Sequence, residues 1–109
     1  MKRPTSPPGA RAALAIAHLI QANPGLDELP IRWEVTRAKS VQPQIEHMHP
    51  DAQQVIEALA AALELPLDRY LFTTDDGIEQ VHLTASGRWA SVPWHLSVFA
   101  PAPEAGGDR

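Results

Sequence analysis

The chain has 109 residues, of which 44% are hydrophobic and 20% are charged, and its formal net charge is −4. This length and composition predict one globular domain and exclude the low hydrophobicity and high charge typical of disordered chains. The absence of cysteine excludes disulfides, thiolate zinc sites and a cysteine nucleophile. The acidic balance disfavours nucleic acid as a partner, because capture of a phosphate backbone needs clustered Lys and Arg.

The two ends of the chain lack hydrophobic periodicity and are rich in Pro, Gly and Ala. We therefore expect disordered arms at residues 1–9 and 101–109, flanking a single domain over residues 10–100. No apolar run approaches the roughly 18 residues of a membrane span, and prolines, Arg11 and His18 break the resemblance of the first residues to a signal peptide. A cytoplasmic protein without a membrane partner is the expectation.

The first helix is indicated by Ser6 as N-cap and Pro7 just inside it. Asn23-Pro24-Gly25 ends it, because the residue before proline avoids helical geometry. His18 is expected to face solvent. The predicted buried face consists of Ala13, Ile16, Ala17 and Ile20, widened by Leu14 and Leu19.

Residues 31–37, "IRWEVTR", alternate apolar and polar side chains and predict a half-buried strand. A weaker extended segment, residues 41–47, would pair back onto it through "RAKS". Pro43 has no amide donor, so we expect this segment to be an edge strand.

The second helix is predicted from an apolar stripe that recurs at helical spacing. His49 or Asp51 would lie at its N-cap, with Pro50 as an early helical residue, and Asp51 would complement the helix dipole. The stripe consists of Ala52, Val55, Ile56, Leu59, Ala60 and Leu63.

The segment "EHMHPD" before this helix has an alternative interpretation as a metal site. His47 and His49 point the same way in an extended segment, and Asp51 offers an oxygen. A third ligand at diagnostic spacing is missing, and an H-x-H pair is common by chance. A strand end followed by a helix cap is therefore preferred, and no cofactor is predicted.

The last third of the domain predicts a three-stranded antiparallel meander with tight turns at Asp76-Gly77 and Ser86-Gly87. These turns would set Phe72 opposite Val81 and Val81 opposite Val92. The resulting core face is Tyr70, Phe72, Val81, Leu83, Ala90, Val92, Trp94, Leu96 and Val98. The predicted fold is a two-layer α+β domain, with two amphipathic helices packed on one face of an antiparallel sheet.

The opposite face of the meander is the predicted functional surface. It would carry Leu71, Thr73, Gln80, His82, Thr84, Trp89, Ser91, Pro93, His95 and Ser97. Its aromatic, histidine and small hydroxyl side chains, almost without charge, are typical of protein interfaces. Leu71, His82, Trp89 and His95 are the candidate partner-binding residues. Ser91 would lie opposite His82 and Ile78 opposite His95, which leaves the two histidines about 13 Å apart, too far for one metal ion.

No catalytic motif is present, and Asp75-Asp76 is explained by turn chemistry, so the protein is predicted not to be an enzyme. The leading function is an interaction module that binds a protein, either another chain or a second copy of itself. The alternatives are metal binding at His47 and His49, or a small regulator that contacts DNA through Arg32, Arg37 and Lys39.

Two stretches carry a resemblance to a family. "LTASGRWASVPWHLSVFA", with its G-x-W-x-x-V pattern, and "LAIAHLIQANPGLDELPIRWEV" resemble small uncharacterised actinobacterial proteins built as helix, strand, helix and three-stranded meander. The resemblance implies a cytoplasmic protein linked to gene clusters or mobile elements. It transfers no catalytic residue, and "EHMHPD" has no counterpart in it.

Overall fold

The computed structural model describes residues 8–102. Of the arms expected at residues 1–9 and 101–109, residues 1–7, with the Ser6 and Pro7 cap, and residues 103–109 lie outside the described residues, whereas residues 8–9 belong to α1 and residue 101 to β5. The fold is α+β, as predicted, and the domain reaches slightly past residues 10–100. Its elements are α1 (Pro8–Ala22), the 3-10 helix η1 (Pro24–Glu28), β1 (Ile31–Arg32), β2 (Gln44–Ile45), α2 (Ala52–Leu63), β3 (Asp68–Thr73), β4 (Glu79–Trp89) and β5 (Val92–Pro101).

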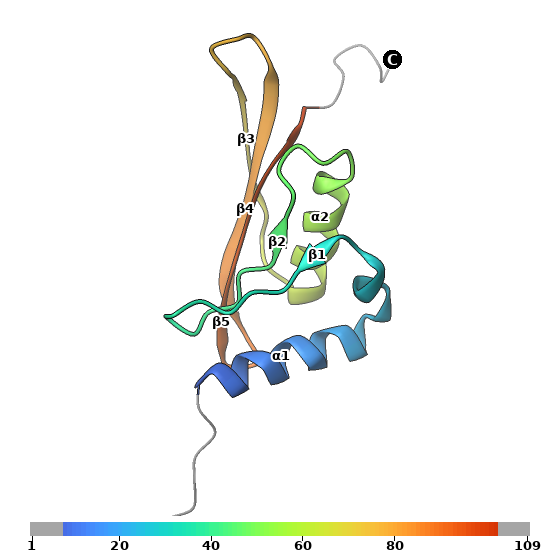
Figure 1. The fold of residues 1–109 in the computed structure, drawn as a ribbon, viewed down its shortest axis with the longest axis vertical. Coiled ribbons are helices and arrows are strands. Elements are labelled where there is room, and N and C mark those ends of the chain that lie inside the picture. Colours follow the sequence, from blue (N-terminus) through green and yellow to red (C-terminus); the bar gives the residue numbers. More distant parts are fainter. Residues whose placement is uncertain (1–7, 103–109) are drawn as a thin grey trace, which may run out of the picture.

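The predicted meander is confirmed as an antiparallel sheet in the order β3-β4-β5. Helix α2 lies along one face of this sheet, which we call the inner face (Figure 1). All six residues of its predicted stripe are buried. They pack against Leu83, Trp94, Leu96 and other inner-face residues in one continuous hydrophobic core.

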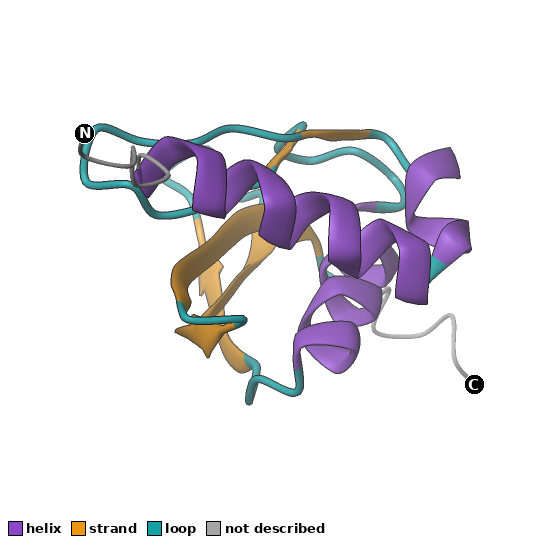
Figure 2. Cartoon of the chain, turned by 90° about the horizontal axis from the view of Figure 1, so that it is seen from below, coloured by secondary structure: helices purple, strands orange, loops and turns teal. Residues whose placement is uncertain are grey.

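Helix α1 lies across the end of the meander near the β4–β5 turn, whereas α2 lies along its side (Figure 2). The buried face of α1 is Ala12, Ala15 and Leu19, with Ile16 at its margin. The prediction that Ala13, Leu14 and Ala17 face the core is wrong, because all three are exposed. Apolar residues surround most of this helix, so their spacing alone does not select a face. His18 is exposed, as predicted.

The predicted pairing of residues 31–37 with residues 41–47 is confirmed by the partners Ile31–Ile45 and Val35–Val41. The predicted length of the strand over 31–37 is wrong, because regular strand is limited to Ile31–Arg32 and the contact at Val35 is an isolated bridge. The edge position predicted for the second segment is confirmed for β2, which pairs with β1 alone among the described strands, but it is wrong at Val41. Val41 also forms a parallel bridge to Trp94 of β5, where its amide donates to the Pro93 carbonyl at 2.9 Å. Val41 therefore lies between Val35 and β5.

The register of β3 against β4 differs from the prediction by one residue. Leu71, not Phe72, pairs with Val81, and Tyr70 pairs with His82. The connection is the longer loop 74–78, in which the Ile78 amide donates to the Thr74 hydroxyl at 3.0 Å. A one-residue shift moves every side chain of a strand to the opposite face, so Tyr70 and Phe72 leave the predicted core for the outer face.

The second turn also differs from the prediction. It lies at Ala90-Ser91, where Trp89 pairs with Val92, and not at Ser86-Gly87. Despite the different position of the turn, Val92 and every second residue after it in β5 face the core, as predicted. The observed turn places Trp89 on the inner side, however, and removes Ala90 from the core.

Gly87 lies within β4, where a turn was predicted. A Cβ atom at this position would approach Cδ2 of Leu65 to 2.5 Å. The absence of a side chain thus leaves room for the Leu65 side chain, which follows α2. This contact with Leu65 is a role that the dipeptide Ser86-Gly87 does not reveal.

Candidate functional site

The outer face of the meander carries a group of rings that neither helix covers. Tyr70 and Phe72 come from β3, His82 from the central strand β4, and Phe99 from β5. We call these four residues the outer aromatic cluster. Tyr70 stands directly opposite His82 on one side, and Phe99 stands opposite it on the other. The four side chains therefore share one face.

Phe99 is the centre of this cluster. The His82 ring stacks on it with a centroid separation of 4.3 Å and an interplanar angle of 11°. Phe72 contacts it edge-on, at 5.7 Å and 80°. Such stacked and edge-to-face arrangements are favourable for aromatic pairs, so the rings form an ordered surface across three strands.

A polar contact fixes the orientation of His82. Its Nε2 atom shares a hydrogen bond of 3.0 Å with the Ser97 hydroxyl, which lies beside it on β5. The imidazole is therefore held between a ring on one side and a hydroxyl at its tip.

Two members of the cluster are exposed to solvent. Tyr70 is 59% exposed and Phe72 is 36% exposed, whereas Phe99 and His82 are half-buried. Solvent-exposed rings supported by packed rings form a contact surface that needs little reordering on binding, since aromatic side chains have few rotatable bonds.

His47 extends the cluster at its margin. Its ring centroid lies 5.3 Å from that of Phe99, and its Nδ1 atom accepts a hydrogen bond from the Phe99 amide at 3.0 Å. The Met48 amide donates in turn to the Phe99 carbonyl at 2.6 Å. Residues 47 and 48 thus provide hydrogen-bond partners for the backbone of Phe99 at the far edge of β5.

Of the four residues predicted to bind a partner, only His82 and His95 lie on the outer face. His95 is exposed and stands opposite Ser86, while His82 stands opposite Phe99, so the predicted partners Ile78 and Ser91 are wrong. The two histidines remain four strand positions apart on β4 and β5.

Leu71 and Trp89 are not on the outer face. Leu71 shares the side of Val81 and is 67% exposed, because the β3–β4 hairpin projects past the helices (Figure 1). Trp89 packs edge-on against Trp94 at 5.8 Å, and its carbonyl accepts the Trp94 indole N–H at 3.1 Å. Its role in the structure is to close the core beside the β4–β5 turn.

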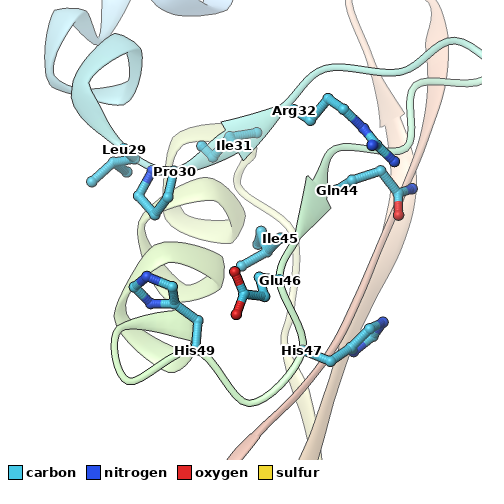
Figure 3. Close-up of a pocket in the computed structure, with 9 residues that line it drawn as sticks. All are labelled: Leu29, Pro30, Ile31, Arg32, Gln44, Ile45, Glu46, His47 and His49. Carbon is cyan, nitrogen blue, oxygen red and sulfur yellow. The ribbon is translucent and has the colours of Figure 1, made fainter.

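The segment "EHMHPD" connects β2 to α2 and contains the N-cap residue of the helix. This residue is Asp51, as predicted, although its side chain forms no capping hydrogen bond, and the His49 Nδ1 atom accepts the Asp51 amide at 3.0 Å. Pro50 precedes the helix, so its predicted helical position is wrong. His47 and His49 point in different directions (Figure 3). Within residues 8–102, no group of three His, Asp or Glu side chains is arranged to hold a metal ion.

An open depression of about 690 Å³ lies between β1 and this segment. Figure 3 shows Arg32 and Gln44 at one end, His49 at the other and Glu46 between them. Arg32 is 76% exposed and forms an ion pair with Glu34 at 3.6 Å. The other two candidate DNA contacts, Arg37 and Lys39, are exposed in the turn between the paired segments.

The hairpin that carries Tyr70 and Phe72 is joined to α2 by an ion pair. The Arg69 guanidinium donates to the Glu57 carboxylate at 2.5 Å. This hydrogen bond, with a second from Gln53, holds the pKa of Glu57 below its ordinary value of 4.5. The carboxylate is therefore charged at neutral pH and holds β3 against the helix.

Comparison of the chain with protein-family models, curated protein sequences and solved structures finds no match. The resemblance to actinobacterial proteins stays a prediction. Within the described residues, no helix combines the length and the apolar character that are needed to cross a membrane.

Sequence reasoning missed three of the four residues in the cluster. Phe99 continues the outward series Pro93, His95 and Ser97 by one more step, so the alternation of β5 contained the signal that identifies it. Tyr70 and Phe72 were assigned to the core because a two-residue turn was assumed.

Proposed function

We propose that the protein is a non-catalytic interaction module of the cytoplasm, which binds a protein partner through the outer aromatic cluster. The observation that carries this proposal is the stacked assembly of Phe72, His82 and Phe99 on a sheet face that no helix covers. Exposed aromatic side chains are the residues that most often dominate binding energy at protein interfaces.

The composition of the face supports a protein partner over a charged ligand. The cluster contains no Lys, Arg, Asp or Glu, and its neighbours on the outer face include Ser97 and Thr84. Rings surrounded by hydroxyl groups combine apolar contact area with hydrogen-bonding atoms at the rim. A nucleic acid or a small anion would instead require basic side chains close to the rings.

The proposal is tested by affinity capture from the cytoplasm of the native cell with wild-type protein and two variants. His82→Thr combined with Phe99→Thr removes both central rings and keeps side chains that favour strands. Leu14→Ala is the control, because Leu14 is a 55% exposed apolar residue on α1. Circular dichroism of each variant establishes that the fold is retained.

We expect one partner to be recovered with wild type and with Leu14→Ala, and its recovery to fall at least about tenfold with the double variant, since hot-spot rings cost more than 1 kcal/mol each. The recovered protein is then purified and titrated against the same three proteins. Equal binding by all three would place the interface elsewhere and overturn the proposal.

A further inference from the structure

Strand β3 forms an edge of the meander that the described residues leave unpaired. The sheet order is β3-β4-β5, and all six residues of β3 are exposed. The opposite edge, along β5, is protected. The carbonyl of Val41 and the side chain of His47 accept hydrogen bonds from the amides of His95 and Phe99. The domain thus closes one edge of its sheet and leaves the other available.

Proteins usually protect a free edge with Lys, Pro, a bulge or a charge that points inward. The sequence of β3, "DRYLFT", contains neither Lys nor Pro, and its pairing with β4 is regular over six positions. Its one cation, Arg69, is neutralised by Glu57 of α2. The middle of this edge, residues 70–72, is therefore uncharged, regularly paired to β4 and open to a further strand.

The ladder between β3 and β4 determines which backbone groups face outward. Thr74 donates its amide to the Ile78 carbonyl at 2.8 Å, at the loop end of the ladder. Hydrogen-bonded and non-hydrogen-bonded pairs alternate in an antiparallel ladder, so Phe72 and Tyr70 bond to β4. The amides and carbonyls of Arg69, Leu71 and Thr73 consequently point to the free edge.

This alternation fits a second copy of the same strand in an antiparallel arrangement. With a two-fold axis at Leu71, each Leu71 pairs with Leu71 of the second copy, and Arg69 pairs with Thr73. All of these residues point their backbone groups outward, so about six hydrogen bonds can form across the axis. An axis midway between two residues would instead pair outward groups with inward ones.

The same register is favourable for the side chains. On the outer face, Tyr70 of each copy would lie opposite Phe72 of the other copy. The symmetry gives two such aromatic cross-strand pairs, and pairs of this kind stabilise a sheet. On the inner face the two Leu71 side chains, each 67% exposed in the monomer, would cover each other. In this register, neither Asp68 nor Arg69 lies opposite a side chain of like charge in the second copy.

We infer that the protein forms a symmetric homodimer through the edge of β3, with Leu71 on the two-fold axis and a continuous six-stranded sheet. The inference can be tested separately from the proposed partner-binding function, because it uses the backbone of β3 with the side chains of Tyr70, Leu71 and Phe72 and does not need the rings of His82 and Phe99. The interface is at the small end of the known range, so association is expected to depend on protein concentration.

The test uses the full chain and two variants that place opposite charges at position 71. Leu71→Lys and Leu71→Glu each place like charges on the axis, which disfavours the homodimer. A mixture of the two variants places Lys against Glu and restores pairing. Leu14→Lys is the matched control, because Leu14 is similarly exposed but lies on α1. Sedimentation is measured from about 1 μM to about 1 mM.

As protein concentration increases, we expect the sedimentation mass of wild type and of Leu14→Lys to rise from 11.9 kDa toward twice that value. Each Leu71 variant alone should associate at least about tenfold more weakly, and the mixture should recover the dimer. His82→Thr with Phe99→Thr should still dimerise, which separates this inference from the binding proposal. A wild type that stays monomeric, a Leu71→Lys variant that associates like wild type, or a mixture that does not recover would each overturn the inference.

Discussion

At the scale of single residues, the β4–β5 turn is the position where the sequence is least suited to its conformation. Ala90 and Ser91 have φ angles of 53° and 62°, in the left-handed region, although neither is glycine. This geometry is that of a type I′ turn, which favours Asn-Gly. A left-handed residue with a Cβ atom costs about 1–2 kcal/mol. The sequence predicts the turn at Ser86-Gly87 instead, because Ser-Gly is a common turn dipeptide and Ala-Ser is not.

Replacing Ala90→Asn together with Ser91→Gly should raise the free energy of unfolding by about 1–2 kcal/mol, since both new residues tolerate positive φ. The contacts of this turn support the design, because Arg88 donates to the carbonyl of Ser91 and not to its hydroxyl. Urea unfolding of the variant and wild type measures the difference. A loss of stability would show that the turn lies elsewhere, whereas Ser86→Asn, within β4, should give no gain.

At the scale of elements, α2 was predicted almost completely and the strands were not. The stripe of α2 repeats over three turns with polar residues between, so spacing alone selects its buried face. The strands were recognised from alternation, but their pairing depends on loop length. The alternation of β3 does not distinguish a two-residue turn from the loop closed by Thr74. The pairing register of β3 against β4 differs by one residue between the two connections, so Leu71 lies on the face where Tyr70 and Phe72 were predicted, and these two rings lie on the opposite face.

The contact between α2 and β3 should make stability depend on pH. The hydrogen bond from Arg69 lowers the pKa of Glu57, so the ion pair contributes stability above the ordinary pKa of 4.5 and loses it as pH falls through the lowered value. Both side chains are about half exposed, at 47% and 40%. Solvent screening therefore limits the contribution to about 0.2–1 kcal/mol.

Glu57→Gln should lower the free energy of unfolding at pH 7 by this amount, and the loss should be smaller at about pH 3, because the wild-type carboxylate takes up a proton as pH falls through its lowered pKa. Arg69→Gln should produce the same pH dependence, and the double variant should lose no more than either single variant. Urea unfolding at the two pH values measures all four proteins. Additive losses at pH 7 would show that the pair is not coupled.

At the scale of the whole molecule, the fold class, the order of the elements and the meander could be predicted, and the composition of the candidate site could not. The class follows from hydrophobic periodicity, which is local. The site is assembled from three strands, and its membership is decided by register, which is set by the Thr74 loop and the Ala90-Ser91 turn. His82 was placed correctly because its own strand decides its face, whereas Trp89 lies beyond the misplaced turn.

The measurement that tests the binding claim most directly is photo-crosslinking in the native cell, with a photoreactive phenylalanine analogue at Tyr70 or, as control, at Leu14. Both positions are more than half exposed, on the outer face and on α1 respectively. We expect a covalent adduct with a partner protein from position 70 and none from position 14, whereas an adduct with a second copy alone would report the β3 edge. Adducts from position 14 alone, or none from position 70, would contradict the assignment of the outer face as the binding surface.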